Sequence, residues 1–137
     1  TEGLQALRAY EPSHDAMRAL LRNYFAVDPT LITDELVAIR YEASVADGAY
    51  EAYRAMFFDP RHGSELGIAE EEVRAITTPA LLVHGREDKV VPLSVSVSML
   101  DLLPNADLHV FSHCGHWTQI ERADEFYALV KAYLDRP

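Results

Sequence analysis

Residues 78–92 read TPALLVHGREDKVVP, an apolar run that begins after a proline and ends at Gly85. A continuous apolar run of this kind predicts a strand buried on both faces, as the strands of parallel sheets are. A helix is predicted to start with Pro92 at its first position, which proline suits well. The charged residues between strand and helix, Glu87 and Asp88, are then expected just past the carboxyl end of the strand.

A second strand, loop and helix follow the first. Residues 106–111, ADLHVF, predict a short strand, and a helix is predicted over about residues 123–134. Between them lies FSHCGHWTQIE, residues 111–121, with two histidines, the only cysteine and the only tryptophan of the chain. This order predicts a parallel pair of strands joined by a right-handed crossover. Both loops then lie at the carboxyl edge of the sheet, where open α/β sheets bind ligands.

The two loops supply a candidate acid–histidine pair, Asp88 and His116. Neighbouring parallel strands lie about 4.8 Å apart, so loops of this length bring the two side chains within hydrogen-bonding reach. A carboxylate that accepts the Nδ1–H of an imidazole fixes its tautomer and leaves Nε2 free as a general base. Gly115 is expected to let the backbone turn, so that His116 points back over the sheet. Together the pair makes up two thirds of a catalytic triad.

The first half of the chain predicts three helices. Ser13 and Thr33 are the expected N-caps of the first two, and the third is expected over about residues 49–58. These helices are amphipathic but rich in Tyr, Phe and Met, which indicates a mobile or ligand-facing layer as much as a core. The first residues include no initiator Met and no signal-peptide pattern, so we expect the chain to begin inside a longer protein.

Composition bounds the class of protein. With 137 residues, of which 49% are hydrophobic, the chain is long enough for one domain with a core. A formal net charge of −10 disfavours nucleic acid and anionic membranes as partners. The single cysteine cannot form an intrachain disulfide, and no spacing of Cys and His suggests a zinc site. No apolar run approaches the roughly 18 residues of a membrane helix, and we expect a cytoplasmic protein.

Two segments carry a resemblance to a known family. TTPALLVHGREDKVVPLSVS, residues 77–96, and HVFSHCGHWTQIERADEF, residues 109–126, resemble the acid and histidine segments of the α/β-hydrolase superfamily. The phrases HGREDKVVP and CGHWTQIE are most similar to those of the meta-cleavage-product hydrolases, the 2-hydroxy-6-oxohexa-2,4-dienoate type of C–C bond hydrolase. In the first half, PSHDAMRALL, ITDELVAIRYEAS and AMFFDPR resemble the helical cap of that family. The resemblance covers nearly the whole chain.

The resemblance implies an α/β fold with a defined division. Residues 1–76 would form the helical cap, or lid, and residues 77–137 would form the C-terminal part of an α/β-hydrolase core. That part consists of two parallel strands and two helices at one edge of the sheet. Such a strand pair is marginal by itself, so a further segment or another chain is expected to complete the sheet.

The resemblance also implies the roles of four residues. Asp88 matches the acid of the triad and His116 its general base, while Trp117 matches an aromatic wall and Arg40 the arginine that binds the substrate carboxylate. The substrates of the family are vinylogous 1,5-diketones made by ring-opening dioxygenases in aromatic degradation. They are ketonised, attacked at the distal carbonyl and cleaved between two carbons, without a metal or organic cofactor. The implied partners are a small dienoate substrate and further copies of the chain in a homo-oligomer.

The triad nucleophile of the superfamily is missing from the sequence. Neither the G-x-S-x-G elbow nor the HGGG-like oxyanion loop occurs, and HGSELG around Ser64 has the wrong pattern. We therefore expect a C-terminal half whose serine lies outside these residues. An esterase or lyase of the same fold, a non-catalytic binding module and a fragment without separate function remain alternatives.

Each candidate residue has a plainer interpretation as well. Asp88 is alternatively a turn residue, His116 a loop histidine that caps the last helix, and Trp117 a packing residue. Arg40 is alternatively paired with one of two nearby carboxylates, Glu42 or Asp47.

The remaining polar residues of these loops are expected to be structural or exposed. We expect a small buried thiol at Cys114 rather than a nucleophile, because no second group is placed to orient His116 toward it. His84 is expected to be a hydrogen-bonded structural histidine and Glu87 a solvated neighbour. The two histidines expected at the surface are His109 and His113. Alternation along DLHVF puts His109 on the opposite face of the strand from Leu108 and Val110, and burial of one of these faces remains an alternative.

Overall fold

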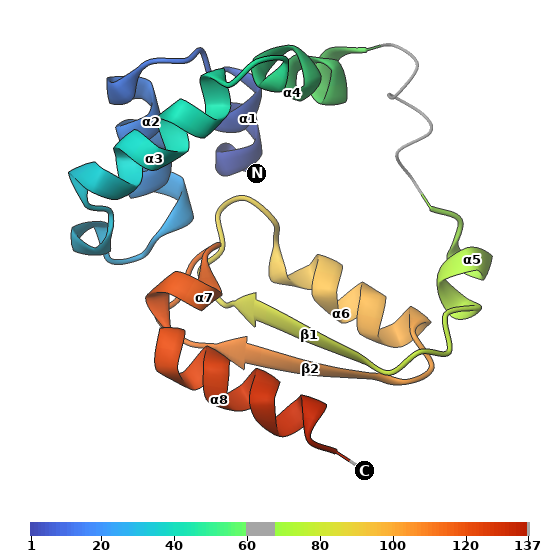
Figure 1. Cartoon of the computed structure of the whole chain (residues 1–137). Helices are drawn as coiled ribbons and strands as arrows, with labels where there is room; N and C mark the ends of the chain where they lie inside the picture. The colour runs from blue at the N-terminus through green and yellow to red at the C-terminus, as the bar shows by residue number, and fades with distance from the viewer. Residues whose placement is uncertain (60–67, 137) are drawn as a thin grey trace.

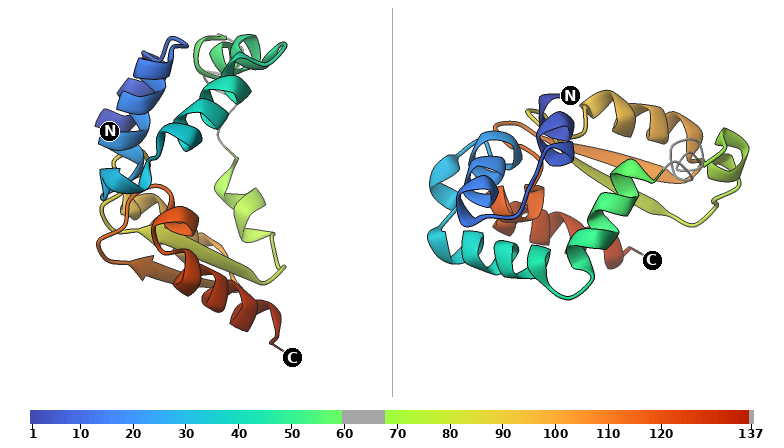
Figure 2. Two further views of the ribbon diagram at one scale, coloured as in Figure 1. Left: turned by 60° about the vertical axis from the view of Figure 1, so that its left-hand side comes forward. Right: turned by 90° about the horizontal axis from the view of Figure 1, so that it is seen from above.

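The computed structural model describes residues 1–59 and 68–136, and shows two layers of different kinds. A helical layer formed by the first half of the chain stands over the carboxyl ends of two parallel strands, as Figures 1 and 2 show. Ser64 lies outside the described residues. No helix among the described residues combines the length and apolar character needed to cross a bilayer.

The helical layer consists of four α-helices and two short turns of other helix types. The α-helices are α1 (Glu2–Arg8), α2 (His14–Leu20), α3 (Asp34–Val45) and α4 (Ala49–Phe58). Between α2 and α3 the chain forms the π-helical turn η1 (Leu21–Phe25) and the 3-10 turn η2 (Pro29–Leu31). The sequence did not predict α1, which is short and depends on contacts with the loop after the first strand.

Local signals set the starts of these helices. The Ser13 hydroxyl accepts a hydrogen bond from Ala16 N at 3.1 Å, and the Thr33 hydroxyl accepts one from Leu36 N at 3.1 Å. Both predicted N-caps are therefore confirmed. The bounds of α4 also agree with the prediction, and it begins after Gly48, whose φ of 72° is the left-handed conformation that glycine adopts without strain.

The sheet consists of β1 (Ala80–Gly85) and β2 (Ala106–Phe111), which pair in parallel from end to end. The crossover between them is α6 (Leu93–Leu102), and α8 (Ala123–Leu134) packs on the opposite side of the pair (Figure 1). Two short helices, α5 (Glu70–Arg74) and α7 (Thr118–Glu121), precede β1 and α8. The predicted strands and their parallel pairing are confirmed.

Two details of this half differ from the sequence prediction. Pro92 is the N-cap of α6 and not its first helical residue, because its ψ of 143° keeps it extended. The first four residues of β1 are half-buried and not fully buried, and Val110 of β2 is 37% exposed. The physical reason is that β1 pairs only with β2 among the described residues, so one edge of the strand has no neighbour.

The main cluster of buried side chains lies in the helical layer and extends to the histidine loop, residues 111–117. Leu21, Ile32 and Val37 are at most 2% exposed, and Trp117 of the histidine loop belongs to the same cluster. Burying one such aliphatic side chain contributes about 1.5–3 kcal/mol to stability. This core therefore fixes the helical layer directly above the two loops at the strand ends.

Candidate active site

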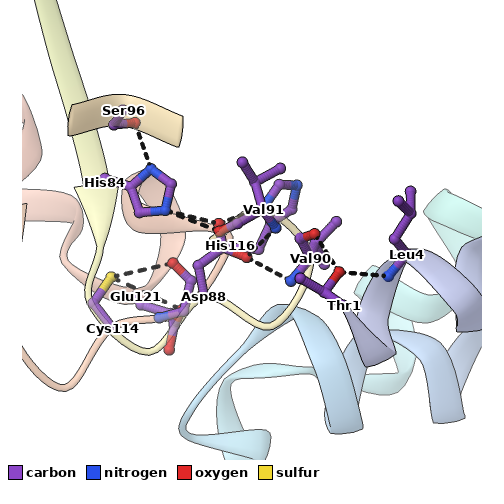
Figure 3. Close-up of polar contacts among 11 residues, drawn as sticks. Thr1, Leu4, His84, Asp88, Val90, Val91, Ser96, Cys114, His116 and Glu121 are labelled. Atoms are coloured by element: carbon purple, nitrogen blue, oxygen red, sulfur yellow. Dashed lines mark hydrogen bonds and ion pairs between the residues drawn. The ribbon is translucent and has the colours of Figure 1, made fainter. Parts of the chain in front are cut away.

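Asp88 lies in the loop after β1 with its side chain 5% exposed. Its Oδ1 accepts hydrogen bonds from Val90 N at 2.7 Å and from Val91 N at 2.9 Å. Its Oδ2 lies 2.9 Å from Nδ1 of His116, and Figure 3 shows the two side chains pointing toward each other. The contact expected from the sequence is therefore present.

The hydrogen bonds of Asp88 decide its ionisation. Burial would by itself raise the pKa of this carboxyl group. The bonds from His116 and from the backbone N–H groups of Val91 and Val90 outweigh burial and hold the pKa of Asp88 below its usual range. The group is thus a carboxylate at neutral pH, and it accepts the proton on Nδ1 of His116. In the neutral ring this leaves Nε2 as the basic nitrogen.

Residues 86–92, the loop after β1 that carries Asp88, form the acid loop. His84, the last side chain of β1, contacts this loop from the buried side. Its Nε2 lies 3.0 Å from the carbonyl oxygen of Val91, and its Nδ1 lies 2.8 Å from the Ser96 hydroxyl. Because a carbonyl only accepts, Nε2 carries the proton and Nδ1 of the neutral ring accepts from Ser96. The expectation of a hydrogen-bonded structural histidine is confirmed.

The first helix anchors the same acid loop. The Thr1 hydroxyl donates to the carbonyl oxygen of Val90 at 2.6 Å and accepts from Leu4 N at 3.2 Å (Figure 3). The backbone N–H of Gly3 donates to the carbonyl oxygen of Lys89 at 3.0 Å. A Cβ at Gly3 would lie 2.6 Å from that oxygen, so only glycine permits this approach.

His116 is 28% exposed and sits at the end of a tightly bonded loop. The ring of Phe25 packs edge-on against its imidazole, with centroids 4.9 Å apart. Gly115 was expected to provide a sharp turn, but its φ is not positive. The glycine is needed because the backbone of Phe25 lies too close for a side chain at this position. A Cβ there would lie 2.8 Å from the carbonyl oxygen of Phe25.

Successive backbone N–H groups of the histidine loop each have an acceptor from another segment. Cys114 N donates to Glu87 Oε2 at 3.0 Å, and Gly115 N donates to Glu121 Oε1 at 2.7 Å. His116 N and Trp117 N donate to the carbonyl oxygen of Phe25 at 2.8 Å and 3.3 Å. These bonds fix the backbone on both sides of the imidazole.

Two carboxylates in this arrangement were missed from the sequence. Glu87 was expected to be a solvated neighbour, but its bond to Cys114 N holds the histidine loop, and that bond is the main cause that lowers the pKa of Glu87. Glu121 was not singled out. Hydrophobic periodicity predicts which side chains are buried but gives no information about these two carboxylates. The one available signal in the sequence was that each lies near a loop whose backbone N–H groups need acceptors.

Trp117 and Arg40 lie together at a cavity of about 260 Å³. The guanidinium carbon of Arg40 is 5.5 Å from the centroid of a Trp117 ring, a cation–π distance. No ion pair joins Arg40 to Glu42 or Asp47 among the described ion pairs. Trp117 is 9% exposed and packs edge-on against Phe25, so it serves both packing and the cavity wall.

The rest of the cavity wall is apolar and aromatic. Its lining includes Leu7, Tyr10, Met17, Leu20, Leu21, Phe25, Tyr50 and Tyr53. The hydroxyl of Tyr53 donates to the carbonyl oxygen of Leu7, and burial raises the pKa of Tyr53 to about 12. The hydroxyl of Tyr10 bonds Ser44 at 2.9 Å. Ser44 and Tyr50, which also line the cavity, have hydroxyls bonded to backbone carbonyl oxygens of the same layer. Arg40 is therefore the one charged group among the lining residues.

Cys114 and the other two histidines can be assigned from their surroundings. Cys114 is 0% exposed, and burial, followed by the charge of Glu121, raises its pKa to about 12. It is therefore a buried thiol and not a thiolate nucleophile.

The other two histidines of the second half lie in β2 and in the histidine loop. His113 is exposed, as expected. His109, whose strand face could be exposed or buried by the sequence pattern, is half-buried, and its ring centroid lies 4.4 Å from that of Phe111. In residues 1–59 and 68–136, no three His, Cys, Asp or Glu side chains are grouped to hold a metal ion.

Known proteins share this arrangement of sequence and structure. The chain is 46% identical to the 2-hydroxymuconate semialdehyde hydrolase of Pseudomonas putida over 136 residues, covering 98% of this chain and 48% of that protein. It is 42% identical to the 2-hydroxy-6-oxo-2,4-heptadienoate hydrolase of P. putida strain F1, covering 98% and 49%. The chain thus spans about half the length of these curated relatives.

Solved structures agree with the relatives. A meta-cleavage product hydrolase from Pseudomonas fluorescens IP01 superposes with a TM-score of 0.86 at 46% identity, over 98% of this chain and 50% of that one. The resemblance inferred from the acid and histidine segments is confirmed by these matches. Residues 5–123 also match the family described as the alpha/beta hydrolase fold. Because this match covers most of its length, the chain belongs to the α/β-hydrolase fold family.

Proposed function

We propose that this chain is the C-terminal half of a hydrolase that cleaves a C–C bond in a vinylogous 1,5-diketone ring-fission product of aromatic degradation. The observation that carries the proposal is the bond between Asp88 and His116 beside a cavity with Arg40 and Trp117 in its wall. The names of the similar proteins, which are hydrolases of 2-hydroxymuconate semialdehyde and of a related oxo-dienoate, support the substrate class.

In this proposal the two layers have separate tasks. Residues 1–76 act as the cap and carry Arg40 and most of the cavity wall. Residues 77–137 act as the C-terminal part of the core and carry the acid and histidine loops. The cavity is lined by the helical layer and, from the second half of the chain, by Trp117, which follows His116 directly. Its volume of about 260 Å³ suits a small molecule.

The four site residues have distinct chemical roles. Asp88 holds Nδ1–H of His116, so that Nε2 can take a proton from a serine hydroxyl or from water and return it to the departing carbon. Arg40 pairs with the carboxylate of the dienoate, and the ring of Trp117 closes the wall beside His116. The serine and its oxyanion donors lie outside residues 1–137. No cofactor takes part in the proposed steps.

The free edge of β1 is the place where the missing half would join. The half-buried β1 residues and the exposed Val110 leave apolar surface that a neighbouring strand and further helices would cover. We propose that the N-terminal half of the same protein supplies this strand, and that the complete protein is a cytoplasmic homo-oligomer.

The test is to complete the protein and follow its substrate. The N-terminal half of the P. putida 2-hydroxymuconate semialdehyde hydrolase is placed before Thr1, and loss of the yellow dienolate absorbance of the ring-fission product is recorded. We call this chimera the completed protein. We expect turnover that His116→Ala abolishes. The control is His113→Asn in the same loop, where the left-handed φ of 52° suits asparagine and activity should persist.

The same experiment separates the alternative functions. Hydrolysis of simple esters without C–C cleavage would make the chain part of an esterase of the same fold. A folded completed protein that turns over neither substrate would contradict the proposal and favour a binding module.

A further inference from the structure

One carboxylate joins the histidine loop to the helical layer. Glu121 Oε1 accepts from Gly115 N at 2.7 Å, and Glu121 Oε2 accepts from Val27 N at 2.7 Å. Gly115 immediately precedes His116, whereas Val27 lies 94 residues before Glu121, between η1 and η2. Figure 3 shows Glu121 beside Cys114. A single side chain thus contacts both the histidine loop and the helical layer above it.

The same short segment of the helical layer touches the loop a second time. The carbonyl oxygen of Phe25 accepts from His116 N at 2.8 Å, and the ring of Phe25 packs on the imidazole. Residues 25–27 are therefore joined to the histidine loop directly at Phe25 and, through the carboxylate of Glu121, at Val27. The Phe25 carbonyl alone would allow the loop to pivot, whereas the Glu121 bridge adds a second fixed point.

We propose that Glu121 is a positioning residue. It fixes the distance between the backbone before His116 and the helical layer, and so keeps the imidazole within hydrogen-bonding distance of Oδ2 of Asp88. This rests on the proposed function, in which His116 is the general base. A carboxylate suits the position because both partners are N–H donors, and an ionised carboxylate presents two acceptor oxygens. Glutamine has the same shape but presents only one acceptor, and its NH₂ group would face the other N–H.

Two substitutions break the bridge from opposite ends in the completed protein. Glu121→Gln removes one acceptor, and Val27→Pro removes the donor in the helical layer. Proline fits the sequence context because Ala26 is extended, with φ −118° and ψ 144°, as the residue before a proline should be. The control is Asp124→Asn, which removes an exposed carboxylate in the first turn of α8.

The first readout is physical and does not need turnover. In Glu121→Gln, the NH₂ group repels one of the two backbone N–H groups, and the neutral amide oxygen bonds the other less strongly than a carboxylate does. We therefore expect amide hydrogen exchange at Gly115 and at the distant Val27 to quicken together, by roughly tenfold or more. The parent should show a proton signal from the Nδ1–H of His116 bonded to Asp88, and in Glu121→Gln this signal should broaden or disappear. Asp124→Asn should change neither the exchange rates nor the signal.

The second readout is the rate. Glu121→Gln and Val27→Pro should each lower kcat roughly 10- to 100-fold with KM nearly unchanged, because a displaced base affects the chemical step and not binding. The double variant should lose no more than the worse single variant, since both act on one bridge. Normal Gly115 exchange and His116 signal in Glu121→Gln, or single losses that multiply in the double variant, would overturn the proposal.

The test of Glu121 can be distinguished from the test of the proposed function. If the completed protein turns over no substrate, the proposed function fails, while amide exchange and the His116 proton signal still decide whether Glu121 positions the loop. If Glu121→Gln does not fold, Val27→Pro gives the same two readouts at Gly115 and His116 without changing the histidine loop.

Discussion

Nδ1 of His116 lies 2.9 Å from Oδ2 of Asp88, although the two residues are 28 positions apart. Each residue follows the carboxyl end of one of two paired strands, and the parallel register of β1 and β2 brings these ends together. The remaining oxygen of Asp88 accepts two backbone N–H groups of its own loop, so the carboxylate cannot rotate away from the imidazole without breaking them.

Asp88→Asn should leave the fold nearly intact and remove most of the activity. The side-chain oxygen of asparagine can still accept from Val90 N and Val91 N, but its NH₂ group would face Nδ1 of His116 and favour the wrong tautomer. We expect kcat of the completed protein to fall by about 10³- to 10⁴-fold. Asp101→Asn, at an exposed position of α6, is the control. Activity of Asp88→Asn within tenfold of the parent would contradict the assigned role.

Stability should depend on the ionisation of Asp88 in acid. Because the pKa of Asp88 is lowered in the folded state, its stabilising contribution is fully present above the ordinary pKa of about 3.9 and is lost as pH falls through the lower folded value. The melting temperatures of the parent and of Asp88→Asn should therefore differ most above pH 4 and converge below it. Thermal unfolding followed by circular dichroism between about pH 2 and pH 7 measures this. A constant difference over the whole range would be inconsistent with it.

Gly85→Ala should be strongly destabilising, because the end of β1 and the histidine loop are in backbone contact. A Cβ at Gly85 would lie 2.0 Å from the carbonyl oxygen of Gly115, so one of the two segments must move. We expect a loss of about 3 kcal/mol in the free energy of unfolding, at the upper end for overpacking. The matched control is Gly48→Asn, where a Cβ meets nothing within 4 Å and asparagine tolerates the left-handed φ. Urea titration compares the two, and equal losses would argue against the contact.

Cys114 should be unreactive in the folded protein. Its thiol is 0% exposed and its pKa is raised to about 12, so almost none of it is thiolate at pH 8. A thiol-specific colour reagent should react at least about 100 times more slowly with the folded protein than with the protein in denaturant. Cys114→Ala should keep catalytic activity. Rapid labelling accompanied by loss of activity would revive a role for the thiol.

Arg40→Gln should weaken substrate binding more than it slows the chemical step. Loss of a charge-assisted bond to the substrate carboxylate costs about 1.5–3 kcal/mol, which corresponds to a rise in KM of roughly 10- to 100-fold. Arg40→Lys should recover only part of this, because lysine keeps the charge but not the planar group that stacks on Trp117. Arg74→Gln, in α5, is the control, since Arg74 pairs with Glu70 and is not among the residues that line the cavity. An unchanged KM would indicate that the carboxylate binds elsewhere.

Sequence alone determined the parts of this protein that depend on near neighbours along the chain. Ser13 and Thr33 cap helices that begin within a few residues, and the apolar runs 80–85 and 106–111 specify strands by their own composition. The meeting of Asp88 and His116 could also be predicted, because parallel strands put their carboxyl ends side by side.

Only the tertiary structure decided how the histidine loop is held. The bonds from His116 N to Phe25 and from Val27 N to Glu121 join segments about 90 residues apart, and no periodicity or local propensity encodes such contacts. The space at Gly115 and the half-buried state of β1 likewise depend on which segments pack beside them. Local sequence fixes backbone conformation through steric preference and capping, whereas the partner of a buried N–H group is set by the packing of the whole chain.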